Sequence, residues 1–137
     1  MTPDELLRYR TDGYLILRGF VDPAACDALR ARAGELIAAF DPGTARSIFT
    51  TDEQVRTTDD YFLGSGDQIR FFFEEDGRTI NKIGHALHDL DPVFDRFSRT
   101  PALAALVDAL GLADPRLMQS MYILKQPFVG GEVRWSA

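Results

Sequence analysis

The chain has 137 residues, which is the length of one ordinary domain and is enough to bury a hydrophobic core. Its 45% hydrophobic and 26% charged residues are typical of a soluble globular protein and exclude a disordered or fibrous one. The chain carries 15 basic and 21 acidic residues, a net charge of −6, whereas nucleic-acid binding depends on neutralising phosphates. We therefore expect no nucleic-acid partner.

The single cysteine, Cys26, cannot form an intramolecular disulfide, which favours a cytoplasmic location. Residues 1–10 lack the apolar run of a signal peptide. The most apolar later stretch, 102–113, is too short to span a bilayer and is interrupted by Asp108 and Gly111. We expect no membrane segment.

Four helix starts are predicted where a capping side chain is followed directly by proline and then by apolar residues at helical spacing. Glu5 is placed to complete a capping box in the first helix, and Gly13 and Gly111 end the first and last of the four. The second is the longest and reaches Phe40. The four capping residues are Thr2, Asp22, Asp91 and Thr100.

The long helix has an apolar stripe at helical spacing that includes Cys26. No residue pattern places a base beside this thiol, so we interpret Cys26 as a small buried hydrophobic residue rather than a nucleophile. The stripe consists of Cys26, Leu29, Ala33, Leu36, Ile37 and Phe40.

Three apolar segments are predicted as strands: 14–18, 69–74 and 117–125. The second contains three consecutive phenylalanines, which indicate burial on both faces, and a tight turn follows at 75–78. The third has a partly polar face that lines a site or meets water. Residues 41–66 lose their periodicity and are predicted to form a long irregular connection.

Common catalytic motifs are absent: the chain has no phosphate-binding glycine loop, CxxC, GxSxG or HExxH. His85 and His88 lie three residues apart, a spacing that puts both imidazoles on one face if the segment is helical. A third ligand would make a metal site there, but bare histidine pairs more often pack or face solvent.

Lys82 lies among apolar and small residues. Its ammonium group has two interpretations from sequence context: it presents a charge to an anionic ligand such as a carboxylate, or it reaches out to solvent. Lys125 has the same ambiguity. Residue context alone leaves both alternatives open.

Four runs of sequence resemble the phytanoyl-CoA dioxygenase family: 12–22, 65–74, 80–94 and 119–133. The resemblance covers essentially residues 1–137 but corresponds to the N-terminal half of the family domain. Members of this family are Fe(II), 2-oxoglutarate-dependent oxygenases. The resemblance implies an α+β fold with an N-terminal helical region and the first strands of a double-stranded β-helix, or jelly roll, whose C-terminal half is absent.

The family pattern also implies which functional residues this sequence contains. In the family, GGEV is followed after two residues by the HxD that supplies the first two iron ligands, but Ser136 stands at the histidine position and Ala137 after it. We therefore expect no Fe(II) site, no catalytic residue and no turnover by these residues alone. Lys82 and Met121 match positions expected to contact 2-oxoglutarate, whereas His85 and His88 match residues outside the metal triad.

The resemblance thus predicts a truncated dioxygenase, inactive alone, whose parent reaction hydroxylates a small-molecule substrate and decarboxylates 2-oxoglutarate. The alternatives are a non-catalytic module that binds a small anion or another protein, and a half-enzyme completed in trans by a C-terminal half. Without a second sheet, apolar surface is expected to remain exposed and to promote self-association.

Overall fold

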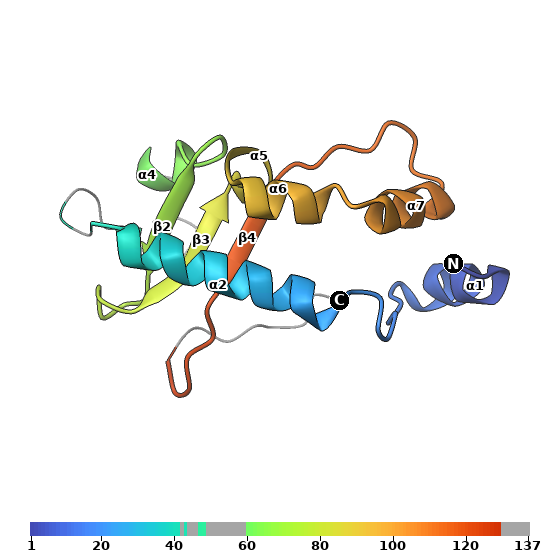
Figure 1. Cartoon of the computed structure of the whole chain (residues 1–137), viewed down its shortest axis with the longest axis horizontal. Helices are drawn as coiled ribbons and strands as arrows, with labels where there is room; N and C mark the ends of the chain where they lie inside the picture. Colours follow the sequence, from blue (N-terminus) through green and yellow to red (C-terminus); the bar gives the residue numbers. More distant parts are fainter. Residues whose placement is uncertain (42, 44–46, 49–59, 130–137) are drawn as a thin grey trace.

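The structure is a computed structural model that describes residues 1–41, 43, 47–48 and 60–129 (Figure 1). The described elements combine helices with a mainly antiparallel sheet, consistent with the predicted α+β class. In chain order they are α1 (Pro3–Asp12), α2 (Pro23–Ala39), β1 (Ser47–Ile48), α4 (Asp60–Leu63), β2 (Ile69–Phe73), β3 (Ile80–His85), α5 (Leu87–Leu90), α6 (Pro92–Ser98), α7 (Pro101–Leu110) and β4 (Ser120–Ile123).

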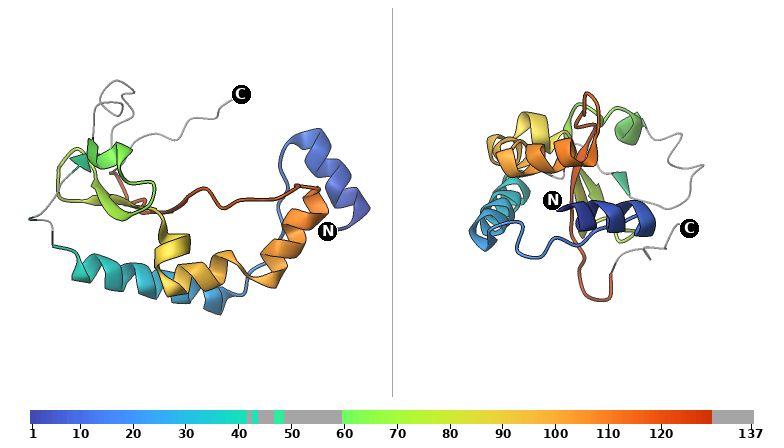
Figure 2. Two further views of the ribbon diagram at one scale, coloured as in Figure 1. Left: turned by 90° about the horizontal axis from the view of Figure 1, so that it is seen from above. Right: turned by 90° about the vertical axis from the view of Figure 1, so that its right-hand side faces the viewer.

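The helices lie in layers around the sheet. Within the described residues, the strands follow the order β1-β2-β3-β4. Helices α2 and α6 lie side by side on one face of the sheet, while α4 lies on the other side (Figure 2). Helices α1 and α7 lie near each other, at the end of the molecule away from the sheet (Figures 1 and 2).

All four predicted helix starts are confirmed. Thr2 forms the full capping box, accepting a 3.2 Å hydrogen bond from the Glu5 N–H while the Glu5 carboxylate accepts one of 2.7 Å from the Thr2 N–H. Asp22 and Asp91 accept hydrogen bonds from amides of the first turns of α2 and α6. Thr100 precedes α7 as predicted but makes no capping hydrogen bond with its side chain.

The two predicted glycine stops are also confirmed. Gly13 and Gly111 have φ angles of 79° and 76°, the left-handed conformation that glycine adopts without a steric penalty.

The sheet is built on a β2–β3 hairpin. The turn between these strands is closed by Asp76, whose carboxylate accepts 2.8 Å hydrogen bonds from the N–H groups of Arg78 and Thr79. Antiparallel pairing then sets Phe72 opposite Lys82, so the predicted strand and its reversal are confirmed. Strand β4 pairs with the other edge of β3, also antiparallel, and β1 pairs with β2 in parallel.

The hydrophobic core lies between the sheet and α2. Phe71 and Phe73 point to this side, and the ring of Phe40 stacks on that of Phe71 with centroids 4.1 Å apart. Burying a side chain of this size stabilises the fold by about 1.5–3 kcal/mol. The buried members of the cluster are Ala33, Phe71, Phe73, Ile83, Leu87 and Phe94, and all three phenylalanines of β2 are buried as predicted.

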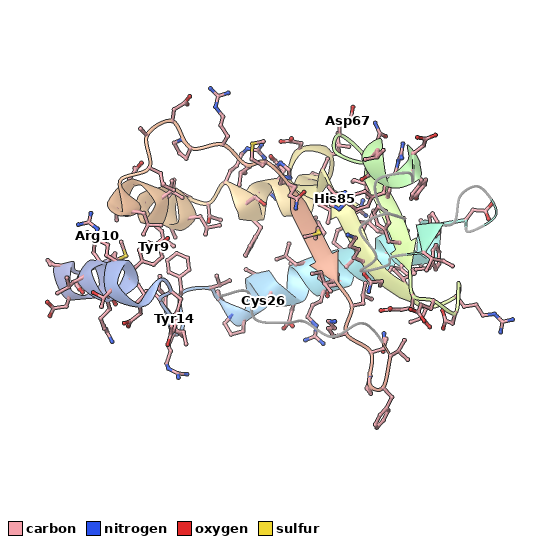
Figure 3. All side chains as sticks on the ribbon, turned by 180° about the vertical axis from the view of Figure 1, so that it is seen from behind. Tyr9, Arg10, Tyr14, Cys26, Asp67 and His85 are labelled. Carbon is pink, nitrogen blue, oxygen red and sulfur yellow. The ribbon has the colours of Figure 1, made fainter. Side chains whose placement is uncertain are left out.

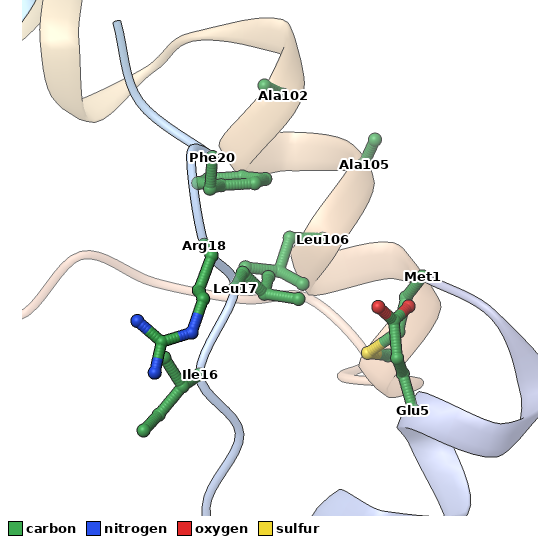
Figure 4. A pocket seen from close by; sticks show the side chains of 9 residues that line it. All are labelled: Met1, Glu5, Ile16, Leu17, Arg18, Phe20, Ala102, Ala105 and Leu106. Carbon is green, nitrogen blue, oxygen red and sulfur yellow. The ribbon is translucent and has the colours of Figure 1, made fainter. Parts of the chain in front are cut away.

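The strand predicted at 14–18 is wrong. A strand needs a backbone partner, and this segment packs its side chains against a helix instead. Leu17 lies beside Leu106 of α7, where both line a pocket (Figure 4). The alternation that suggested a strand persists in the burial, because Leu15 and Leu17 are half-buried while Tyr14 and Ile16 are exposed.

The predicted burial of Cys26 is also wrong, because its side chain is exposed. Figure 3 shows it near the N-terminal end of α2. The residues of α2 that pack on the core begin at Leu29. The first turn of α2, including Cys26, therefore extends past the core, although the apolar pattern of the helix continues through it.

The connection predicted to be irregular contains two elements that sequence periodicity missed. Strand β1 and the one-turn helix α4 both lie between residues 41 and 66, and the remainder of that segment falls partly outside the described residues. Both elements are too short for a periodic pattern to reveal them.

The last predicted strand is confirmed over a shorter range, as β4. Its side chains alternate as expected: Ser120 and Tyr122 are half-buried, while Met121 and Ile123 are exposed by 41% and 52%. Exposed apolar side chains continue after the strand at Phe128 and Val129. Among the described helices, none combines the length and the apolar character that crossing a bilayer requires.

Candidate functional site

The candidate site lies on the face of the sheet opposite α2, which we name the Lys82 face. Paired residues of neighbouring strands project to the same side, and the pairs are Phe72 with Lys82 and Gly84 with Met121. Lys82 and Met121 are therefore diagonal neighbours on this face. The structure brings together the two residues that the resemblance implicated in cofactor binding.

Lys82 is a buried lysine, with 5% of its surface exposed. Its Nζ lies 4.8 Å from the ring centroid of Phe72 and 5.3 Å from that of Phe62. The negative faces of aromatic rings stabilise an ammonium group at such distances. Of the two interpretations of Lys82, the structure excludes full exposure to solvent.

Met121 packs over the one position of β3 that has no side chain. A Cβ atom added at Gly84 would lie 3.2 Å from Cγ of Met121 and 3.4 Å from the Ser120 carbonyl oxygen. Glycine therefore allows the Met121 side chain to approach the β3 backbone closely. This contact places a flexible apolar group next to Lys82 on the same face.

Helix α4 and the turn after it cover part of the Lys82 face. Arg70 donates a hydrogen bond to the carbonyl oxygen of Tyr61, and its guanidinium lies 4.6 Å from the Tyr61 ring centroid. The Tyr61 hydroxyl accepts a 3.2 Å hydrogen bond from the Phe71 N–H. These contacts hold Phe62 over Phe72, with ring centroids 5.9 Å apart.

His85 ends strand β3 and is buried, with 6% of its surface exposed. Its Nδ1 lies 2.7 Å from Oγ of Ser65, which is also buried. The ring contacts the same two phenylalanines as Lys82, with centroids 5.4 Å from Phe72 and 5.7 Å from Phe62. Burial and, second, the charge of Lys82 lower the pKa of His85, so its imidazole is neutral at pH 7.

His88 lies in α5 rather than on one helical face with His85. Both of its ring nitrogens have partners: Nδ1 lies 2.8 Å from Oγ of Ser120, and Nε2 lies 3.2 Å from the Leu117 carbonyl oxygen. Its own N–H also donates to Ser120 at 3.0 Å. His88 therefore joins α5 to β4, which agrees with its interpretation as a structural histidine.

Within the residues the structure describes, no three His, Cys, Asp or Glu side chains come together to hold a metal ion. His88 has no free nitrogen for a metal, and His85 has no second donor of that kind beside it. The described residues thus do not fit an Fe(II) site. The segment 130–137, in which Ser136 takes the histidine position, lies outside the described residues.

The comparison with known proteins decides the family. The family model "Phytanoyl-CoA dioxygenase (PhyH)" matches residues 9–137. The chain belongs to the phytanoyl-CoA dioxygenase family. Phytanoyl-CoA dioxygenase domain-containing protein 1 of Mus musculus is 47% identical over 150 residues, which cover 97% of this chain and 52% of the relative.

Relatives from other organisms give the same family result. The homolog of that protein in Dictyostelium discoideum is 44% identical over 97% of this chain and 51% of its own length. A protein of Arabidopsis thaliana named phytanoyl-CoA dioxygenase is 43% identical with the same coverage. The chain spans about half the length of these phytanoyl-CoA dioxygenase relatives, and the predicted family is confirmed.

Sequence reasoning missed part of the candidate site in this phytanoyl-CoA dioxygenase family member. It singled out Lys82 and Met121 but not Phe62 or Ser65. Both lie in the segment predicted to be irregular, and the family-like run that begins at Ser65 assigns no role to its side chain. Their role depends on the chain returning over the sheet, which no local pattern encodes. Lys125, the other lysine, is exposed at the end of β4.

Proposed function

We propose that the Lys82 face binds 2-oxoglutarate as part of an Fe(II)- and 2-oxoglutarate-dependent dioxygenase of the phytanoyl-CoA dioxygenase family. The observation that carries the proposal is the buried ammonium of Lys82, held on two aromatic rings diagonally from Met121. Family membership supports the identity of the ligand.

The chemistry of the two side chains suits a dicarboxylate. Lys82 supplies three N–H donors and a full positive charge, and a charge-assisted hydrogen bond to a carboxylate is stronger in a buried site than in water. Met121 supplies a pliable apolar wall against the methylene groups of the ligand. Aromatic rings behind the ammonium restrict its position, so the donor is oriented before the ligand arrives.

Dioxygen would be the oxidant of the parent reaction: one of its oxygen atoms would enter the substrate as the hydroxyl group and the other would enter succinate. Bound 2-oxoglutarate would supply two electrons as it loses CO2. In this proposal Lys82 binds and orients a carboxylate, and Phe62 and Phe72 keep water from the ammonium. Because the described residues do not fit the metal, no reaction step is assigned to iron in this part of the domain.

Calorimetric titration of residues 1–137 with 2-oxoglutarate tests the binding. Lys82→Met removes the charge, and we expect the dissociation constant to rise about 10- to 100-fold, the value of one charge-assisted hydrogen bond. The matched control is Lys125→Met, because the chain has no other lysine and this one is exposed. Equal affinities of the two variants would contradict the proposal.

We also propose that residues 1–137 alone do not turn over 2-oxoglutarate. Ser136 and Ala137 stand where the family has the first part of its metal-binding motif, and a serine hydroxyl is a poor ligand for Fe(II). Incubation of the purified polypeptide with Fe(II), ascorbate and 2-oxoglutarate should release no succinate above the protein-free control. Succinate release that follows protein concentration would overturn this proposal.

The described sheet is proposed to be the first part of the family's double-stranded β-helix, with residues 1–137 forming the N-terminal part of the domain. Strand β4 ends the strand order, and its outer edge has no strand partner within the described chain, so a further strand could add there, as a half-enzyme completed in trans requires. Exposed apolar side chains follow that edge at Met121, Ile123 and Phe128.

A separately expressed polypeptide equivalent to the second half of the relatives tests that alternative. Co-purification with residues 1–137 and recovery of succinate release would support a half-enzyme, whereas light scattering of residues 1–137 alone reports self-association. A chain that binds 2-oxoglutarate, stays monomeric and gains no activity would instead be a small-anion-binding module. The cytoplasmic location and the absence of a nucleic-acid partner stay predictions from composition.

A further inference from the structure

The two histidines of this chain are three residues apart, but their hydrogen bonds assign them opposite tautomers. A carbonyl oxygen only accepts, so Nε2 of His88 donates its proton to Leu117. The Ser120 hydroxyl then donates to Nδ1 of His88 at 2.8 Å, a shorter contact than its 3.5 Å approach to the His85 carbonyl oxygen. Every polar atom of the His88 ring is therefore occupied.

His85 has the other arrangement. The Ser65 hydroxyl donates its single proton to the Phe62 carbonyl oxygen at 2.5 Å, so it can only accept from His85. The proton of the neutral imidazole must then be on Nδ1, which donates to Ser65 across 2.7 Å. Nε2 consequently carries a lone pair.

That lone pair is the unusual feature of the Lys82 face. Nε2 of His85 has no hydrogen-bond partner within the part of the chain that the structure describes, although only 6% of the surface of this residue is exposed. Buried polar atoms are normally satisfied, and an unsatisfied one indicates a missing ligand or water. The ring rests on Phe62 and Phe72, the same rings that carry the ammonium of Lys82.

We propose that His85 is a second anion-binding residue of the Lys82 face: when a carboxylate binds beside Lys82, Nε2 takes up a proton from solvent and donates a hydrogen bond to it. The proposal rests on the proposed function, because it assumes a carboxylate ligand at Lys82. It makes binding of the ligand a proton-linked event.

The charges around His85 explain the coupling. Without ligand, burial and the positive charge of Lys82 lower the pKa of His85 and keep it neutral. A bound carboxylate reverses the sign of the local field and favours the imidazolium. The other titratable or charged groups that the neighbouring elements contribute are Arg70 of β2, Tyr61 of α4, Asp67 of the turn before β2, and His88 of α5 beyond Ser120 of β4.

The direction of the pH effect follows from this coupling. Since the ligand raises the pKa of His85, the complex binds more protons than the free chain between the two pKa values. Affinity must then rise as the pH falls through that window, by at most about tenfold per pH unit. Below the pKa of the free chain the dependence disappears.

Calorimetry in buffers of different ionisation enthalpy measures the coupling directly. The probe is 2-oxoglutarate titrated into residues 1–137 at pH 7, and we expect a fraction of one proton to be taken up per ligand bound. His85→Asn keeps an amide N–H near the Nδ1 position to donate to Ser65 but has no second nitrogen. This variant should lose the proton uptake and bind about tenfold more weakly.

The unaltered chain gives an independent readout if the variant does not fold. Long-range ¹H–¹⁵N NMR of the imidazoles distinguishes tautomers, and His88 serves as the internal control. We expect His85 to be protonated on Nδ1 and His88 on Nε2, with His85 alone gaining a second proton on addition of 2-oxoglutarate.

The outcomes separate the two proposals. Binding of 2-oxoglutarate without proton uptake, or a His85 protonated on Nε2 in the free chain, overturns the role of His85 and leaves the proposed function intact. Absence of binding at millimolar ligand overturns both. Proton uptake that persists in the folded His85→Asn variant also overturns the role of His85.

Discussion

The two faces of the sheet are built from alternate residues of the same strands but differ in chemistry. On one face Phe71, Phe73 and Ile83 pack against α2, and their surroundings are apolar. On the other, Phe72 is fully buried too, but it lies under an ammonium group and beside an imidazole. Burial alone therefore does not distinguish a core residue from a residue of a candidate site.

The difference shows how a short segment serves stability and binding together. Three consecutive phenylalanines in β2 supply the core with two rings and the Lys82 face with one. The strand period of two separates these roles without any insertion or loop. Substitutions on the two faces should consequently change different measured quantities.

The largest expected effect is on the α2 side. Phe71→Ala removes a buried ring stacked on Phe40, and the free energy of unfolding should fall by about 3–5 kcal/mol, measured by urea denaturation. Phe72→Leu is the matched change on the other face. It should cost about 1–2 kcal/mol, yet weaken 2-oxoglutarate binding about three- to tenfold by removing a ring from Lys82. If both variants lowered stability and 2-oxoglutarate affinity to the same extent, the two faces would not have separate roles in stability and binding.

A smaller effect on the free energy of unfolding is expected at the ion pair that joins α2 to α6. Asp91 is buried, caps α6 and accepts a 2.7 Å hydrogen bond from Arg32 of α2. Burial opposes ionisation of this carboxyl, but the hydrogen bonds from Arg32 and from the first amides of α6 outweigh it and lower its pKa. A lowered pKa stabilises the fold above the unfolded-state value of about 4, and this contribution is lost as the pH falls through the folded-state pKa.

Asp91→Asn tests this ion pair while retaining a capping oxygen. At pH 7 the free energy of unfolding of the variant should be about 1–3 kcal/mol lower than that of the unaltered chain. This difference in free energy should narrow below about pH 4. Urea titrations at several pH values measure it. A gap that stays constant down to pH 3 would show that the charge of Asp91 contributes nothing.

The smallest effect on stability is expected near the N-terminal end of α2, which does not pack on the core. Cys26→Ser should change the free energy of unfolding by less than about 0.5 kcal/mol, because the side chain is exposed. In the unaltered chain, a thiol reagent should modify Cys26 completely without denaturant. Protection of the thiol until urea is added would mean that α2 is covered along its whole length.

Elements that are fixed by interactions between neighbouring residues could be predicted from the sequence. The capping residues with prolines at Thr2, Asp22 and Asp91 identified helix starts, because a cap acts within one turn. The phenylalanine run of β2 was predicted with its turn for the same reason. Strand β3 was missed as a strand, since its lysine, asparagine, glycine and histidine are poor strand formers that become buried only between two neighbours.

Long-range packing decided the remaining features. Residues 14–18 have strand-like alternation but lie against α7: Leu17 lines a pocket with Leu106, which is 89 positions further along the chain. The opposite tautomers of His85 and His88 depend on Ser65 and Leu117, which no spacing rule connects to them. Family resemblance, rather than periodicity, was needed to single out Lys82 with Met121.

The central place of β3 in the sheet has a consequence for how the molecule opens. Its backbone amides are hydrogen-bonded to β2 on one side and β4 on the other, so they should exchange with deuterated solvent more slowly than those of α1, which has no buried residue. Lys82 and His85 project from this strand. Fluctuations that release the outlying helices therefore leave the spacing of these two side chains intact until the sheet itself comes apart.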